Sequence, residues 1–203
     1  MTIKFCFVIY LEKNHFIGEG EIRFCYEHPL NDQFCVKIPR VETTRDYTEK
    51  ELKYFKKLSK RSKVNFQFPF YADFRQEIET NLGLGQVFDL VRDETTNEIS
   101  KTLEYYLTKD NSIDDNKLED ALKILKKQMI KHKVFTRDLR ARNICCRIKN
   151  DGTVELVTVD GIGHRDFFPF ADWFYYFSKK KVNRTFKKWH FDSIEDQRKY
   201  LKI

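Results

Sequence analysis

The sequence predicts an α+β fold in which a β-rich N-terminal part precedes a small helical C-terminal part. Short runs of β-forming residues follow one another through the N-terminal half, separated by Gly, Pro and Asn turn signals. A long amphipathic helical pattern then leads into one further pair of β-type runs. With 203 residues, of which 41% are hydrophobic, the chain is long enough for one domain with its own core.

The N-terminal elements follow from local signals. Thr48 and Glu51 have the spacing of a capping box, which predicts a helix that begins there and continues to about Arg61. Pro39 ends the β-type run before it, and Gly83 and Gly85 precede the last run. The β-type segments expected in this half are residues 5–11, 22–26, 34–38, 64–70, 76–82 and 86–91.

The C-terminal elements begin with a helix expected at residues 114–132. Its apolar stripe consists of Leu118, Ala121, Leu122, Leu125 and Met129. Two strands, 144–148 and 155–159, are expected around a turn at 150–152, before a final aromatic helical region. The boundary between the two parts is expected between Arg92 and Ser100, giving an N-lobe of about residues 1–95 and a C-lobe of about 96–203 within one domain.

Composition excludes several other classes of protein. No run of eighteen apolar residues is present, so no segment is expected to span a membrane. The 5 cysteines include no C-x-x-C spacing, which argues against a zinc site or a disulfide framework and suits a reducing cytoplasm. Cys145 and Cys146 are expected to fill strand positions.

The chemistry of the chain centres on two short motifs. Thr136-Arg137-Asp138 is followed five residues after Asp138 by Asn143, the spacing with which protein kinases build a catalytic loop. In such a loop the Asp accepts the proton of an attacking hydroxyl and the Asn holds a metal ion. Asp160-Gly161 then follows an apolar run, where kinases place a second metal-binding Asp.

Phosphoryl transfer also needs positive charge on the phosphates, and Lys37 in the third predicted strand is the candidate for it. A carboxylate on the following helix is expected to orient Lys37; Glu51 is the first candidate and Glu49 the alternative. Gly18 and Gly20 give a partial glycine-rich loop, in which Arg23 stands where a third glycine would be. An ordinary hairpin turn would also use these two glycines.

The sequence as a whole resembles the YrbL family, bacterial proteins named for a PhoP regulatory network and assigned to a protein-kinase-like fold. The resemblance lies in the segments GEGEIRFCYEHP, CVKI, ETNLGLGQVFDLVRDETTNEISKTLEYYL, TRDLRARNICC and VDGIGHRDFFPFADW. It implies a two-lobed fold with a β-rich N-lobe and a truncated helical C-lobe.

The same resemblance implies roles for individual residues. Asp138 would be the catalytic base, braced by Arg137, and Asn143 and Asp160 would hold Mg²⁺. Lys37, oriented by Glu51, would pair the phosphates of ATP. The strand at 87–91 would lead into a hinge that binds adenine through backbone groups; the nucleotide-binding residues expected there are Phe88, Asp89 and Leu90.

Several residues depart from the kinase pattern. Thr136 replaces a histidine, which is expected to alter loop packing, and Asp160-Gly161 lacks an intervening Phe. Asp166 is a rival to Asp160 as the metal ligand, although Asp160 is favoured because it ends a buried-type strand. Only 43 residues (203 − 160) follow Asp160, which is short for the docking of a protein substrate.

These observations predict a cytoplasmic phosphotransferase that uses ATP and Mg²⁺ on a hydroxyl acceptor, with a glycolipid, sugar or small molecule favoured over a protein. A lipopolysaccharide-type glycolipid is one such acceptor. The alternatives are a catalytically silent nucleotide-binding regulatory protein and a basic nucleic-acid-binding protein.

Lysines and aromatic residues interleave at 174–190, and the net charge of the chain is +7. Two interpretations of this segment stay open: a terminal helix with one packed aromatic face and one solvated lysine face, or a surface for a polyanion, such as an anionic membrane at its inner face.

Overall fold

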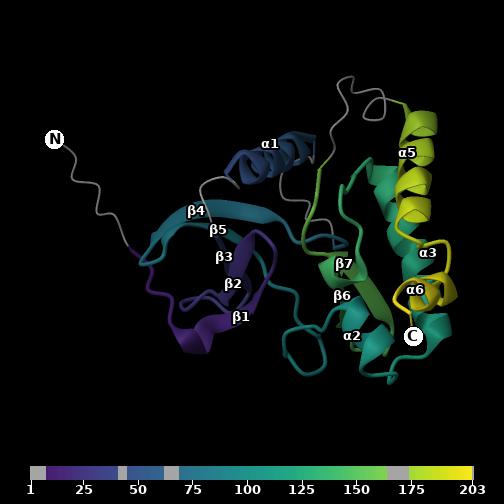
Figure 1. Cartoon of the computed structure of the whole chain (residues 1–203), viewed down its shortest axis with the longest axis horizontal. Helices are drawn as coiled ribbons and strands as arrows, with labels where there is room; N and C mark the ends of the chain where they lie inside the picture. Colours follow the sequence, from purple (N-terminus) through teal and green to yellow (C-terminus); the bar gives the residue numbers. More distant parts are fainter. Residues whose placement is uncertain (1–7, 41–44, 62–68, 164–173, 203) are drawn as a thin grey trace. The chain divides into compact units, whose positions relative to one another are not determined.

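The computed structural model describes residues 8–40, 45–61, 69–163 and 174–202, and the chain divides into two compact units (Figure 1). Unit 1 comprises Met1–Lys53 and Asp73–Leu90, and unit 2 comprises Tyr54–Ala72 and Val91–Ile203. The chain therefore passes between the units three times, and helix α1 (Arg45–Arg61) contributes residues to both.

Unit 1 is built on a five-stranded antiparallel sheet in the order β1-β2-β3-β5-β4. Its elements are η1 (Lys13–His15), β1 (Phe16–Glu19), β2 (Arg23–Glu27), β3 (Phe34–Pro39), β4 (Phe74–Thr80) and β5 (Gly83–Asp89). Successive strand residues point to opposite faces of a sheet. On one face a buried cluster forms around Val36 and Ile38, against which Phe24 and Tyr26 pack. The opposite face of the central strand β3 therefore carries Lys37.

Unit 2 is mainly helical and contains one β-hairpin. Its elements are α2 (Leu103–Thr108), α3 (Asp115–His132), η3 (Ala141–Asn143), β6 (Ile144–Ile148), β7 (Val154–Thr158), α5 (Tyr175–Lys188) and α6 (Ile194–Tyr200). Helix α3 begins at the N-cap Asp114, whose side chain accepts a hydrogen bond from the Asn116 N–H, and ends at Lys133 in the left-handed conformation. The buried stripe of α3 packs against β7 and α5.

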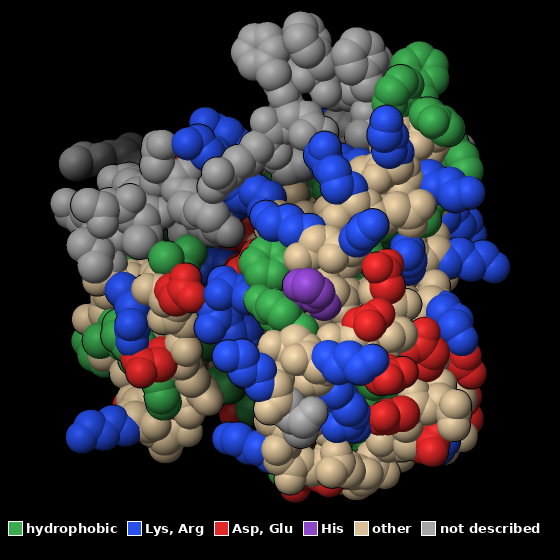
Figure 2. All heavy atoms as spheres, turned by 45° about the vertical axis from the view of Figure 1, so that its right-hand side comes forward, with side chains coloured by type: hydrophobic (Ala, Val, Ile, Leu, Met, Phe, Trp, Pro, Cys, Tyr) green, Lys and Arg blue, Asp and Glu red, His purple; other side chains and the backbone are tan. Residues whose placement is uncertain are grey.

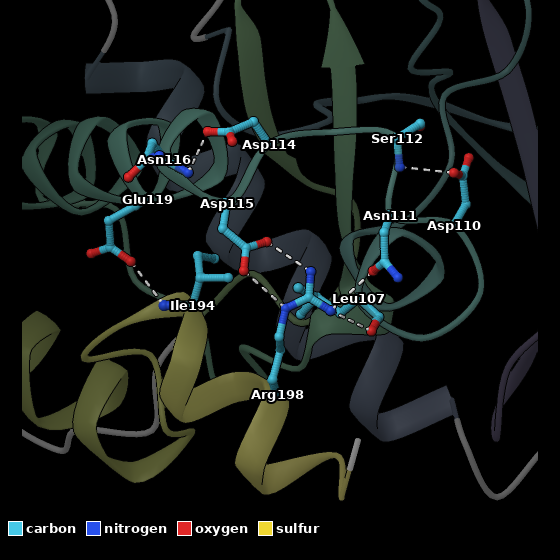
Figure 3. Close-up of polar contacts among 10 residues, drawn as sticks. All are labelled: Leu107, Asp110, Asn111, Ser112, Asp114, Asp115, Asn116, Glu119, Ile194 and Arg198. Carbon is cyan, nitrogen blue, oxygen red and sulfur yellow. Dashed lines mark hydrogen bonds and ion pairs between the residues drawn. The ribbon is translucent and has the colours of Figure 1, made fainter.

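The last helix, α6, is fixed to the rest of unit 2 by polar contacts (Figure 3). The guanidinium of Arg198 forms a two-point ion pair with Asp115, at 2.7 and 3.1 Å, and donates to the carbonyl of Leu107 at 2.9 Å. The Ile194 N–H donates to Glu119 at 2.8 Å. In Figure 2 acidic side chains gather at the lower right of the view.

Several predicted elements are confirmed with close boundaries. They are β3, α3 with all five members of its buried stripe, and the β6–β7 hairpin. The described part of the chain contains no helix that is long and apolar enough to cross a membrane. Cys145 and Cys146 lie in β6, as expected, and both are buried.

Other predicted elements were wrong in place or missing. Of the predicted segment 5–11, residues 5–7 lie outside the described residues, and residues 8–11 give one isolated bridge, between Ile9 and Thr80. The first strand among the described residues is β1, which was not predicted. Helix α1 begins at Arg45, so Thr48 lies inside it and not at its N-cap. Gly85 lies within β5, and α2 was not predicted. Most of the predicted segment 64–70 lies outside the described residues.

Candidate functional site

The two motifs of the sequence lie side by side in unit 2. The Arg137 N–H and the Thr136 hydroxyl both donate to the carbonyl of Gly161, at 2.8 and 2.9 Å. Thr136 and Ile162 form an antiparallel bridge, and the Gly163 N–H donates to the Phe135 carbonyl at 2.8 Å. The hydroxyl of Thr136 also accepts the N–H of Asp138 at 3.2 Å. Thr136, where a kinase has histidine, therefore ties the two loops together.

Gly161 brings the backbone of the second motif against Asp138. Its φ angle is +72°, in the left-handed region, and a Cβ at this position would lie 2.9 Å from the Cβ of Asp138. Any other residue would therefore push the two loops apart. The requirement for glycine after Asp160 thus has a steric cause within this unit.

The carboxylate of Asp138, the predicted catalytic base, is held by Arg140. The guanidinium donates from Nε to Oδ1 at 2.6 Å and from Nη2 to Oδ2 at 2.5 Å. The side chain of Asp138 is 19% exposed and that of Arg140 is 30% exposed. Sequence reasoning missed Arg140, although its position two residues after Asp138 was a signal for a cation beside that carboxylate.

Asn143 and Asp160 offer oxygen atoms that suit a hard cation such as Mg²⁺. The side-chain amide nitrogen of Asn143 donates to the Asp138 carbonyl at 3.2 Å, so the side-chain oxygen of Asn143 is the atom that could bind a cation. The Asp160 carboxylate accepts the Gly161 N–H at 2.7 Å through Oδ1. The Val159 N–H donates to the Asn143 carbonyl at 2.9 Å and so joins the two segments. These two oxygen donors could hold Mg²⁺, and water or phosphate oxygens would supply the remaining ligands.

Lys37 is buried on the central strand of unit 1. Its side chain is 8% exposed, and its Nζ lies over the ring of Phe88 at 4.5 Å from the centroid. Lys37 pairs in register with Cys25 on one side and with Gln86 on the other. A hydrogen bond with Cys25 and burial raise the pKa of the neighbouring Cys35 thiol, so that group stays protonated at neutral pH.

Glu51 forms a buried ion pair with Arg23. The Arg23 Nη1 donates to Glu51 Oε2 at 2.7 Å, and the two side chains are 3% and 1% exposed. The same nitrogen lies 3.3 Å from the Gln86 side-chain oxygen. The predicted pairing of Glu51 with Lys37 stays a prediction. Cys25 in β2 is the register partner of Lys37 in β3, so the two side chains lie on the same face of the sheet. Arg23 is two residues before Cys25 and therefore shares that face, which was the signal for a second cation beside Lys37.

Residues 88–90, predicted to bind adenine, are tied into unit 1. Phe88 is buried, and the carboxylate of Asp89 receives two hydrogen bonds from Arg75, at 2.6 and 2.9 Å. The Asp89 N–H donates to the Asp73 carbonyl and the Leu90 N–H to the Gln33 carbonyl. The N–H groups of Asp89 and Leu90 are therefore already used, and an adenine base would have to form its hydrogen bonds with other backbone groups of this segment.

The predicted glycine loop lies at the β1–β2 turn. Gly18, in β1, pairs in register with Cys25 of β2, and the Gly20 N–H donates to the Arg23 carbonyl at 2.8 Å. A Cβ at Gly18 would meet no atom within 4 Å, so the backbone there is open to approach. Asp166, the rival metal ligand, lies outside the described residues.

The chain is similar in sequence to known proteins. The family model described as PhoP regulatory network protein YrbL matches residues 9–192. The protein YrbL of Escherichia coli (strain K12) is 30% identical over 184 residues, which cover 89% of this chain and 86% of that protein. YrbL of Shigella flexneri gives the same values.

Among solved structures, the chain is similar to residues 1–466 of the protein kinase Rad53 in complex with AMP-PNP, with a TM-score of 0.51 and 16% identity. The match covers 74% of this chain and 38% of the Rad53 chain, so it establishes the fold alone. The α+β, protein-kinase-like fold expected from the sequence is confirmed.

Proposed function

The chain belongs to the family of the PhoP regulatory network protein YrbL, and from that premise we propose that it is a phosphotransferase that uses ATP and Mg²⁺. In the proposed reaction a hydroxyl oxygen of the acceptor attacks the γ-phosphorus of ATP. The bond between that phosphorus and the β,γ-bridging oxygen breaks, ADP leaves, and the hydroxyl proton passes to Asp138.

The observation that carries the proposal is the contact between the two loops of unit 2. Asp138, Asn143 and the Asp160-Gly161 pair come from separate segments and are joined by hydrogen bonds of 2.7–3.2 Å. Phosphoryl transfer needs an oriented hydroxyl and neutralised phosphate charge more than it needs covalent chemistry. Mg²⁺ held by Asn143 and Asp160 would supply that charge, together with Lys37.

The acceptor that we favour is a sugar hydroxyl, as in a lipopolysaccharide-type glycolipid, or another small molecule. Asp160-Gly161 lacks the Phe that protein kinases place between these two residues, and this departure favours a small acceptor over a protein.

A second candidate function is nucleotide binding without catalysis. Arg140 occupies both oxygens of Asp138, so a hydroxyl must share or displace that guanidinium before its proton can be accepted. A protein in which this ion pair persisted with nucleotide bound would bind ATP and transfer nothing.

The two functions are separated by the substitution Asp138→Asn. An enzyme should lose about 10²–10⁴-fold in turnover, the usual contribution of a general base, while its affinity for ATP is retained. Turnover is measured with radiolabelled ATP, by transfer to purified lipopolysaccharide and to the protein itself. Asp120→Asn, which removes a carboxylate that is 74% exposed on α3, is the matched control. Absence of turnover in the wild type with either acceptor, with ATP bound equally by all three proteins, would leave the silent nucleotide binder. Equal turnover in all three proteins would contradict the role of Asp138 as the base.

A further inference from the structure

Four consecutive aromatic side chains at the start of α5 are exposed. Their exposed fractions are 53% for Phe174, 61% for Tyr175, 69% for Tyr176 and 46% for Phe177. Successive residues of a helix turn by about 100° around its axis, so four neighbours cannot share the face that packs on α3. That face consists of Ser178, Val182 and Phe186, which are buried. The expected packed aromatic face of this segment is therefore wrong for residues 174–177.

The exposed rings form one cluster. The ring centroids of Phe174 and Phe177 are 6.2 Å apart and those of Tyr176 and Phe177 are 5.7 Å apart, both in edge-to-face geometry. Single exposed apolar side chains need no explanation, but a contiguous group of them marks an interaction surface. Phenylalanine and tyrosine rings are suited to the boundary between lipid headgroups and acyl chains.

Positive charge surrounds this cluster. Helix α5 contains six basic residues and no acidic one. Lys179 and Lys180 follow the aromatic residues after the buried Ser178, and both lysines are exposed. The Ser178 hydroxyl donates to the Ile130 carbonyl at 3.1 Å, so the last turn of α3 lies against the first turn of α5. Two more exposed lysines, Lys127 and Lys131, lie near that end of α3.

The opposite end of α3 is acidic. Asp114 and Asp115 begin the helix, and Glu195 and Asp196 lie in the first turn of α6, which docks there through Arg198 (Figure 3). In Figure 2 green and blue side chains gather at the upper right, over the start of α5, and red ones below them. An anionic surface would attract one end of this helix pair and repel the other, which fixes an orientation.

We propose that this basic aromatic surface, formed by Lys127, Lys131, residues 174–177, Lys179 and Lys180, binds a membrane that contains anionic phospholipid. The rings enter the boundary of the headgroup layer, and the lysines contact lipid phosphates. Lipid is favoured over nucleic acid because the rings lie edge to face in one cluster, and not as separate flat platforms for successive bases. The inference does not depend on phosphoryl transfer.

The test is co-sedimentation of the full chain with phosphatidylcholine vesicles, with and without phosphatidylglycerol. The wild type should bind the anionic vesicles and not the neutral ones. Lys179→Gln/Lys180→Gln should weaken binding about 30-fold at low salt, because each lysine near the surface contributes about 1 kcal/mol. Lys101→Gln/Lys109→Gln, which removes two other exposed lysines of unit 2, should bind as the wild type does.

A variant without the rings separates the lipid surface from simple charge attraction. Tyr175→Ser/Tyr176→Ser/Phe177→Ser keeps the net charge and should also lose vesicle binding, while its melting temperature shows that it is folded. Vesicle binding that is equal in this variant and the wild type would overturn the proposal. Binding of a single-stranded oligonucleotide by the wild type, without binding of vesicles, would also overturn it. The same holds if the wild type is a dimer that does not bind vesicles and the variant is a monomer.

Discussion

Two arginines hold the carboxylates on which the proposed chemistry depends. Arg140 covers Asp138 in unit 2, and Arg23 is buried with Glu51 in unit 1. Removing one partner of a buried pair costs about 3–5 kcal/mol, since the other charge is left without compensation. Arg23 and Glu51 are therefore structural as much as functional residues. Substitution of either should be accompanied by a measurement of stability before any loss of activity is interpreted.

Asp73 is a carboxylate whose charge destabilises the fold. Burial raises the pKa of Asp73 above its ordinary value of 3.8, and the nearby Asp89 adds to this against the opposing effect of Arg75. A raised carboxyl pKa means that the folded protein binds the proton more tightly than the unfolded chain does. Protonated Asp73 thus contributes its full stabilisation of the fold below about pH 3.8, and this contribution is lost as the pH rises through the pKa of Asp73 in the folded state.

We therefore expect Asp73→Asn to raise the melting temperature at pH 7. The asparagine oxygen can still accept the Phe74 N–H, which Asp73 Oδ1 now accepts at 2.9 Å. The gain should shrink as the pH approaches 3.8, and melting curves of both proteins over this range measure it. A lower melting temperature at pH 7 would show that the ionised carboxylate is stabilising, through Arg75.

At the scale of elements, helix α1 joins the two groups of candidate residues. Glu51 forms an ion pair with Arg23 in unit 1, and Tyr54, about one turn later in the same helix, belongs to unit 2. The Tyr54 hydroxyl accepts the Phe135 N–H at 3.1 Å and lies 3.4 Å from the Lys133 carbonyl. Phe135 directly precedes the Thr136-Arg137-Asp138 motif, so this contact fixes the beginning of the catalytic-type loop.

Tyr54→Phe should lower the free energy of unfolding by about 1–3 kcal/mol, because the buried N–H of Phe135 loses its acceptor. Urea denaturation measures this change. Tyr10→Phe, at a side chain that is 68% exposed, is the control and should change little. Equal stability of Tyr54→Phe and the wild type would mean that water or another group satisfies the Phe135 N–H.

The elements that the sequence predicted well are those with a strong internal pattern. Helix α3 has a cap, a stripe and a left-handed end, and β3 is a short run of β-forming residues that ends at a proline. The start of α1 was mistaken because Thr48 and Glu51 satisfy a capping pattern that the longer helix overrides. Strand β1 was missed because it is short and mostly exposed.

The candidate site was predictable where spacing along the chain determines it. Asp138, Asn143 and Asp160 are close because a short loop and a hairpin separate them. Position along the chain could signal that Arg23 and Arg140 lie near these carboxylates, but the ion pairs themselves depend on side-chain directions, which residue spacing alone does not give. For this reason the sequence identified the carboxylates and not the cations that hold them.

At the scale of the whole molecule, the proposed function predicts that nucleotide binding stabilises the fold. Unit 1 contains Lys37 on its five-stranded sheet, and unit 2 contains the candidate oxygen ligands Asn143 and Asp160. A ligand that binds the folded state and not the unfolded chain stabilises the folded state. Binding of ATP with Mg²⁺ should therefore stabilise the folded chain, by about 2.7 kcal/mol at a ligand concentration one hundred times the dissociation constant.

The most direct test is calorimetric titration of ATP, with and without Mg²⁺, into the wild type, Asp160→Ala and the control Asp120→Ala. The predicted result is binding that requires Mg²⁺, is unchanged in Asp120→Ala and is weakened in Asp160→Ala more with the metal than without it. Melting curves under the same conditions should show the matching stabilisation. Absence of ATP binding with any divalent metal would contradict a nucleotide site and leave a kinase-shaped interaction protein.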